Sequence, residues 1–263
     1  MTKNEIARIF DQATDTPTDL FVIGGASAVN GAVVASIQAI SSTLNVQRIS
    51  GADRIETAIN VAKPRGHLRG APPTTAFLAR SSDYPDALAA SSYAGNVVFY
   101  PSFAPVLLTA TTRSIAESSR TSRPANPTLV QAYLMGGTTA LSSSVASDVS
   151  ALTTTTRLGG ANRYATAVTA AKNFFPTGPT AVGVASGQNF PDALVLGPFV
   201  GKQDLAGQTA SYSMPTLLVK TASIPAGVSA TSARLRQRSS APLSSGRTAA
   251  VSNAVVSSLT SLY

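Results

Sequence analysis

The stretch RISGADRIETA, from Arg48 to Ala58, returns as RLGGANRYATA from Arg157 to Ala167, with six of the eleven positions identical. Unrelated segments of ordinary composition would share about one position. The chain therefore contains an internal repeat. The arginines kept in both copies raise the question of whether the repeated stretch serves structure, binding or both.

Three further motifs recur in the same order as the opening stretch, and all four pairs are separated by 106 to 112 residues. The pairs are SSDYPDAL ending at Leu88 with SGQNFPDAL ending at Leu194, PVLLT at Pro105 with PTLLV at Pro215, and FVIGGASAVNGAV at Phe21 with YLMGGTTALSSSV at Tyr133.

This period predicts a division of the chain into three parts. Residues 1–47 form an amino-terminal extension and the carboxy-terminal part of an incomplete first repeat. Residues 48–156 form a complete second repeat, and residues 157–263 form a third repeat that is degenerate near 234–247, where we expect a loop or a degraded strand. Boundaries placed before the GG strands are the alternative, with units of about 19–130 and 131–263.

Two hydrophobic periods alternate along each repeat. Ile55, Ala58, Ile59 and Ala62 recur at the spacing of one helical face. The segments TTAFLARSS and PVLLTA are short apolar runs, typical of strands buried on both faces. Strand alternating with helix predicts an α/β fold of repeated small modules, each a mainly parallel sheet flanked by helices.

Composition limits the partners. A net charge of +8 favours anionic partners, but only 12% of the residues are charged and there is no Trp, so we expect no nucleic acid as a partner. No apolar run approaches the roughly 18–20 residues of a membrane span, so no membrane insertion is expected. The amino terminus has no apolar core of a signal peptide, and an exported protein would need one upstream.

Catalytic chemistry has few candidates. The single histidine, His67, lies in the Gly/Pro-rich spacer PRGHLRG without a counterpart in the other copy, as expected of a solvated loop residue. Asp83 corresponds to Asn189, so no carboxylate pair is repeated. The absence of cysteine excludes thiolate sites. We therefore expect no enzyme, no catalytic residue, no metal site and no cofactor.

One enzymatic alternative stays open at this point. A GG pair at a strand end before a helix can hold a phosphate, so an α/β enzyme could bind a phosphorylated or nucleotide substrate there. The full dinucleotide-binding spacing is absent, which favours a simple tight turn. A further alternative is a nucleic-acid binder led by the arginine-rich segment 234–247.

Arg54 and Arg163 enter the first turn of a predicted helix, where the helix dipole disfavours cations. They are explained either by an ion pair with a capping aspartate such as Asp86 or Asp192, or by recognition of an anionic group. Each aspartate follows a proline at a predicted helix start, where helix capping is the competing role.

The ordered set of motifs resembles the cell-wall-binding repeat type 2 family of Gram-positive surface proteins, over about residues 19–225. The resemblance implies small α/β modules, commonly three per protein around a pseudo-threefold axis. It also implies non-covalent anchoring to an anionic polysaccharide or teichoic-type polymer, an extracellular place at the cell wall, and further domains of a longer chain. The first module here lacks its amino-terminal part, and the last lacks a recognisable GG strand.

A repetitive polymer would meet equivalent positions in successive modules, and two linked weak sites would gain avidity. The residues that we expect to bind the polymer are the second arginine of each repeated stretch with the polar residues at the following strand end and helix start: Arg54, Ser81, Ser82 and Asp86 in one repeat, and Arg163, Ser186, Gln188 and Asp192 in the other.

Overall fold

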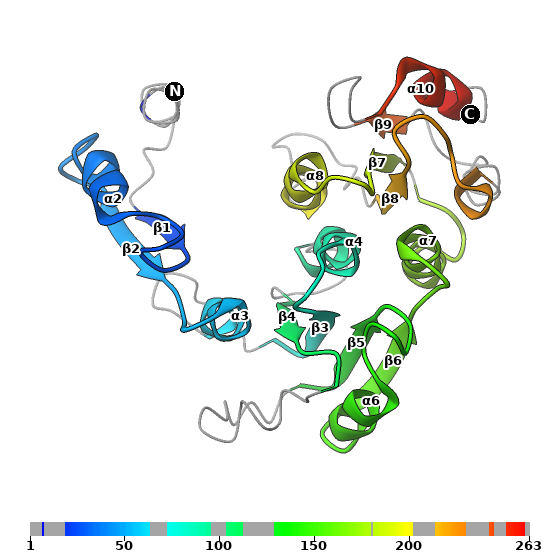
Figure 1. Ribbon diagram of the computed structural model, residues 1–263, viewed down its shortest axis with the longest axis horizontal. Helices are drawn as coiled ribbons and strands as arrows, with labels where there is room; N and C mark the ends of the chain where they lie inside the picture. The colour runs from blue at the N-terminus through cyan, green and yellow to red at the C-terminus, as the bar shows by residue number, and fades with distance from the viewer. Residues whose placement is uncertain are drawn as a thin grey trace. The chain divides into compact units, whose positions relative to one another are not determined.

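The computed structural model describes residues 7, 19–63, 73–95, 104–112, 129–179, 181–201, 214–229, 242–244 and 251–260 (Figure 1). The chain forms two compact units, Met1–Lys63 and Pro64–Tyr263. His67 and the arginines at 234, 236, 238 and 247 lie outside the described residues.

The first unit is a parallel strand pair connected by a helix. Its elements are β1 (Asp19–Ile23), α2 (Gly31–Gln38), β2 (Asn45–Ile49) and α3 (Arg54–Ala62). The strands pair in register from Asp19 with Asn45 to Ile23 with Ile49. Among the residues of this unit that the structure describes, Val22, Leu44, Ile49 and Ile59 are the buried hydrophobic ones.

Local capping explains where the helices of the first unit begin. Asn30 accepts a hydrogen bond from the amide of Ala32 at the start of α2. Asp53 accepts from the amide of Glu56 at the start of α3, and the Glu56 carboxylate accepts from the amide of Ala52 in return. These contacts satisfy amides that have no partner inside a helix.

The second unit contains a four-stranded parallel sheet in the order β4-β3-β5-β6. Helices follow its strands along the chain, as in other parallel sheets. The elements are β3 (Thr75–Arg80), α4 (Pro85–Ala94), β4 (Val106–Thr109), β5 (Gln131–Met135), α6 (Ser143–Ser150), β6 (Thr154–Leu158) and α7 (Arg163–Phe174).

A second parallel sheet in this unit has the order β8-β7-β9. This order repeats β4-β3-β5, so the predicted α/β fold of repeated, mainly parallel modules is confirmed. The degenerate segment contributes the short strand β9 where the first copy has its GG strand. The elements are β7 (Val182–Ser186), α8 (Pro191–Gly201), β8 (Thr216–Val219), β9 (Pro242–Ser244) and α10 (Asn253–Thr260).

The sequence period and the sheets are out of phase. Residue 157, where the sequence repeat begins, lies inside β6, and β6 pairs with β5 of the preceding repeat. The same relation holds for β2, which carries Arg48 and pairs with β1. The repeated stretch therefore completes the sheet of one repeat and then starts the helix of the next.

Helix α4 lies at the centre of the core of the second unit. It packs on the sheet through β3 and against α7 and α8 (Figure 1). The ring of Tyr93, which is fully buried, stacks on Phe174 with centroids 4.4 Å apart. Gly197 of α8 lies directly against Ser91 of α4, and a Cβ at Gly197 would overlap the Ser91 Oγ. Equivalent helices of the two repeats therefore pack in close contact.

The first glycine of each GG pair makes a tight turn that other residues adopt rarely. Gly24 and Gly136 have φ values of 110° and 103°. The Gly24 amide donates to Ile49 O, and the Gly136 amide donates to Leu158 O. The tight-turn interpretation is therefore confirmed, and these two amides point at the neighbouring strand rather than at a ligand.

Candidate functional site at the junction of the two repeats

The first arginine of the repeated stretch holds the GG turn in both copies. Arg48 donates to Gly24 O and Val29 O. Arg157 donates to Gly136 O at 3.0 Å and to Ser142 O at 3.4 Å. Burial lowers the pKa of Arg157. These arginines donate hydrogen bonds to the backbone carbonyl groups around the turn, so their recurrence has a structural cause.

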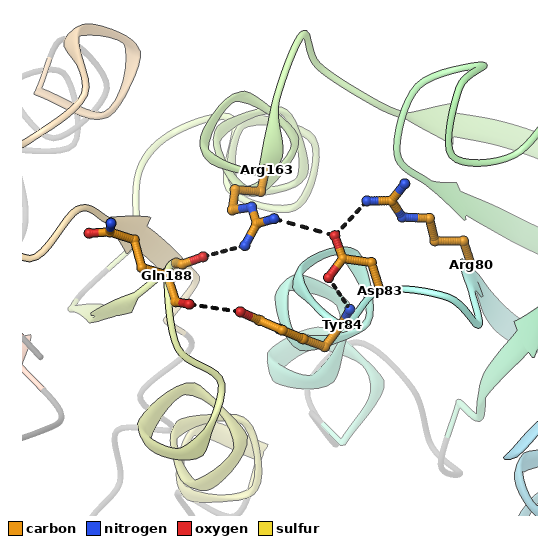
Figure 2. Close-up of polar contacts among 6 residues, drawn as sticks. Arg80, Asp83, Tyr84, Arg163 and Gln188 are labelled. Carbon is orange, nitrogen blue, oxygen red and sulfur yellow. Dashed lines mark hydrogen bonds and ion pairs between the residues drawn. The ribbon is translucent and has the colours of Figure 1, made fainter.

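The second arginine makes different contacts. Arg163, the first residue of α7, donates from Nη1 to Gly187 O at 2.6 Å and from Nη2 to Asp83 Oδ2 at 3.3 Å (Figure 2). Its guanidinium also lies 5.7 Å from the centre of the Tyr84 ring. Arg163 thus connects the turn after β7, in its own repeat, to the turn after β3, in the preceding repeat.

Asp83 receives two guanidinium groups on one oxygen. Its Oδ2 lies 2.6 Å from Arg80 Nη2 and 3.3 Å from Arg163 Nη2, and its Oδ1 accepts the amide of Tyr84 at 2.9 Å. The side chains of Arg80, Arg163 and Asp83 remain 30%, 31% and 23% exposed. We call Arg80, Asp83 and Arg163 the arginine cluster. It is a solvent-accessible group of two cations around one anion.

Tyr84 and Gln188 join the two turns further. The Tyr84 hydroxyl donates to Gln188 O at 2.9 Å, and the Tyr84 ring lies 5.4 Å from that of Phe190. The side-chain carbonyl of Gln188 accepts a hydrogen bond from the backbone amide of Thr221 at 2.8 Å. The backbone amide of Gln188 donates to Ser186 Oγ. Ser186 is buried, so its hydroxyl positions Gln188 from beneath.

The remaining expected site residues differ in their surroundings. Ser82 is exposed, while Ser81 is half-buried and donates its amide to Thr109 O. Both serines precede Asp83 directly, so they lie at the arginine cluster. Asp192 is half-buried at the start of α8. Arg54 is exposed at the start of α3, in the first unit.

Asp86 does not cap its helix, so the capping interpretation is wrong for this residue. The N-cap of α4 is Tyr84, which makes no side-chain capping bond, and Asp86 is the second residue of the helix. Asp86 is 7% exposed, and its carboxylate lies against Gly136. Burial raises the pKa of Asp86, and the nearby Arg80 partly opposes that rise.

Asp83, Arg80 and Tyr84 are the site residues that the sequence did not identify as such. From the sequence, Asp83 is a candidate only for one half of a catalytic carboxylate pair, and that pair is not repeated because Asn189 replaces Asp83 in the other copy. That replacement was the available signal, since a charge present in only one copy indicates a role specific to one junction. The partner of Arg163 depends on the packing of α7 beside α4, which a single sequence does not encode locally.

Within the described ranges, no group of three or more His, Cys, Asp or Glu side chains is placed to hold a metal ion. None of the helices in those ranges is both long enough and apolar enough to span a bilayer.

Comparison with known families gives a match in the second and in the third repeat. The family described as cell wall binding domain 2 matches residues 48–146 and residues 157–256. A relative known by sequence is the N-acetylmuramoyl-L-alanine amidase LytC of Bacillus subtilis, 27% identical over 185 residues. The match covers 70% of this chain but only 34% of the amidase, so the chain spans about a third of that relative.

Two solved structures share the fold. Cwp6 from Clostridium difficile aligns with a TM-score of 0.78 and 24% identity, covering 98% of this chain and 38% of Cwp6. Cwp8 from the same organism aligns with a TM-score of 0.69 and 20% identity, covering 94% of this chain and 39% of Cwp8.

Proposed function

The chain belongs to the cell wall binding domain 2 family, and from this premise we propose that it attaches its protein to the cell wall non-covalently by binding an anionic polysaccharide or teichoic-type polymer. The observation that carries the proposal is the family match in both repeats. The net charge of +8 supports an anionic partner, because it favours encounters with a polyanion.

The proposed contact surface is the junction where the turns after β3 and β7 meet. Arg163 lies at this junction, and nearly a third of its side-chain surface is accessible to solvent. Its neighbour Tyr84 has a ring that can pack against a sugar. Ser81, Ser82 and Gln188 supply polar groups at the same turns. Asp86 and Ser186, which are buried, support this surface from below rather than reach the polymer.

Arg54 in the first unit is the sequence equivalent of Arg163 and supplies a cation there. Asp192 at the start of α8 is the sequence equivalent of Asp86 and supplies a carboxylate. A polymer that carries an anionic group in each repeating unit would meet one arginine after another. Linked weak contacts of this kind gain affinity through high effective concentration.

We place the chain among binding modules rather than enzymes. The alternative of a phosphorylated substrate at the GG turn lacks support, because the first amide of each GG pair is bonded to a strand and its carbonyl to an arginine. The amidase relative is matched over about a third of its length, and we propose that the shared part corresponds to wall attachment. The proposed location is extracellular, at the cell wall.

A competition experiment tests the proposal. Protein bound to purified Gram-positive walls is washed with soluble wall polymer, with dextran, or with double-stranded DNA at matched mass concentration. We expect the anionic wall polymer to release the protein, and dextran and DNA to leave it bound. Equal release by DNA would indicate unspecific attraction to polyanions, and retention against all three competitors would contradict attachment through the polymer.

A further inference from the structure

We propose that Asp83 is a resident anion that occupies a binding site for an anionic polymer group, and that a phosphate or carboxylate of the polymer replaces it between Arg80 and Arg163. The inference rests on the proposed function, because the incoming anion belongs to the wall polymer. It goes further by assigning the ligand a position and Asp83 a competing role.

The geometry around Asp83 is that of an occupied anion site. Arg80, from the same repeat as Asp83, lies 2.6 Å from Oδ2, and Arg163, from the next repeat, lies 3.3 Å from the same oxygen (Figure 2). The backbone amide of Tyr84 donates to Oδ1. Guanidinium pairs with a backbone amide are the donors that bind phosphate and carboxylate in proteins. Here the chain itself supplies the carboxylate.

The site is open to an exchange of anions. All three charged side chains of the arginine cluster keep between 23% and 31% of their surface accessible. Asp83 lies in the turn after β3 rather than in a regular element, so its side chain can turn outward without breaking a strand or helix. A partly accessible ion pair at the surface contributes only modestly to stability, so another anion can replace Asp83 at a small cost in free energy.

The third repeat, residues 157–263, shows what the same turn looks like without a resident anion. Ser186 and Asn189 occupy the positions of Arg80 and Asp83. The cation and the anion are thus both absent from the equivalent turn. Their joint absence fits a unit of arginine and aspartate that acts at one junction only.

The charged groups around the cluster leave a positive balance. Arg80 and Arg163 face Asp83 from β3 and α7, and the buried Asp86 of α4 lies beneath them. Burial disfavours the charged form of Asp86. When Asp83 turns away, two guanidinium groups face solvent together and attract an external anion.

The test compares Asp83→Asn with the unchanged full chain in binding to synthetic poly(glycerol phosphate) and to polygalacturonate, measured by calorimetry at low salt. Asp83→Asn should bind about two- to fivefold more tightly, because the polymer then no longer has to break a partly accessible ion pair, whose strength corresponds to a change in affinity of about that size. The gain should shrink as salt rises. A gain with one polymer and not the other identifies phosphate or carboxylate as the ligand.

Two variants control the interpretation. Asp148→Asn changes the net charge equally at an exposed position on α6, and it should leave affinity near that of the unchanged chain. The double variant Arg80→Ser with Asp83→Asn copies Ser186 and Asn189 of the third repeat and should lose the gain. An equal gain in Asp148→Asn would overturn the proposal by reducing it to net charge.

Thermal unfolding separates the site from a purely structural clamp. If Asp83→Asn melts lower and binds both polymers no better, Asp83 is a clamp and the proposal is wrong. If Asp83→Asn does not fold, Arg80→Ser alone decides, since the proposal requires weaker binding than in the unchanged chain. Binding of the unchanged chain to whole walls tests the proposed function separately, so either idea can fail alone.

Discussion

At the scale of single residues, the two arginines of the repeated stretch have separate roles. Arg157 donates to carbonyls around its own GG turn, whereas Arg163 reaches across to Asp83 of the preceding repeat. The first arginine of the motif thus stabilises the turn of its own sheet, and the second connects two neighbouring repeats. Of Arg157 and Arg163, the second is the one that contacts the other repeat.

Asp86 gives a prediction about pH. Because burial raises its pKa in the folded state above 3.8, its contribution to stability is full below that value and is lost as pH rises through the raised pKa. Asp86→Asn removes this loss. The free energy of unfolding of Asp86→Asn should therefore improve relative to the unchanged chain as pH rises from about 3 to 7.

Urea titrations at several pH values would measure this difference. A difference that moves against Asp86→Asn with rising pH would contradict the assignment, because it would mean that Arg80 and Arg163 stabilise the charged carboxylate more than burial disfavours it.

At the scale of elements, the GG turn should tolerate a side chain at its second glycine but not at its first. A Cβ at Gly136 would lie 2.5 Å from Asp86 Oδ2, and the φ of 103° adds strain. Gly136→Ala should lower the free energy of unfolding by about 2 kcal/mol or more.

Gly137→Ala is the matched control. A Cβ at Gly137 would meet Gly160 O at 3.5 Å, an ordinary contact. Denaturant unfolding should find this variant within about 0.5 kcal/mol of the unchanged chain. Equal losses for both variants would remove the special role of the first glycine.

The contact between α4 and α8 yields a second prediction at this scale. Gly197→Ser should destabilise the chain by about 1–3 kcal/mol, because the new side chain overlaps Ser91. Ser91 and Gly197 are equivalent positions of the two repeats. The exchanged pair Ser91→Gly with Gly197→Ser should therefore recover most of the loss in a double-mutant cycle. Additive losses would show that the two residues do not share one contact.

The elements were the part of the structure most open to prediction from sequence. Helical spacing predicts α3, and apolar runs predict β3 and β4, because these signals are local. The pairing of β6 with the preceding repeat could not be read, since strand partners depend on contacts between distant segments. The Arg163–Asp83 contact was missed for the same reason.

At the scale of the whole molecule, the proposed function predicts that a repetitive polymer contacts more than one repeat. Arg54→Ala or Arg163→Ala should each weaken binding to walls by about tenfold or more, and the double variant should nearly abolish it. Both losses should shrink as salt rises, because screening weakens the contribution that the arginines make. Cosedimentation with walls at two salt concentrations measures these effects.

The structural role of Arg163 requires a stability control for that experiment. Arg163→Ala removes contacts to Gly187 O and Asp83, so its melting temperature should fall modestly. Binding by the folded fraction then reports the ligand contact. Unchanged wall binding by folded Arg163→Ala would assign Arg163 to the junction alone and place the polymer elsewhere.

The most direct test of wall attachment through an anionic polymer is a binding isotherm of the unchanged chain on two preparations of the same walls, one intact and one chemically stripped of its anionic polymer. The account predicts saturable binding to intact walls and a loss of at least tenfold in affinity on stripped walls. Equal affinity for the two preparations would contradict it and direct the search to peptidoglycan itself.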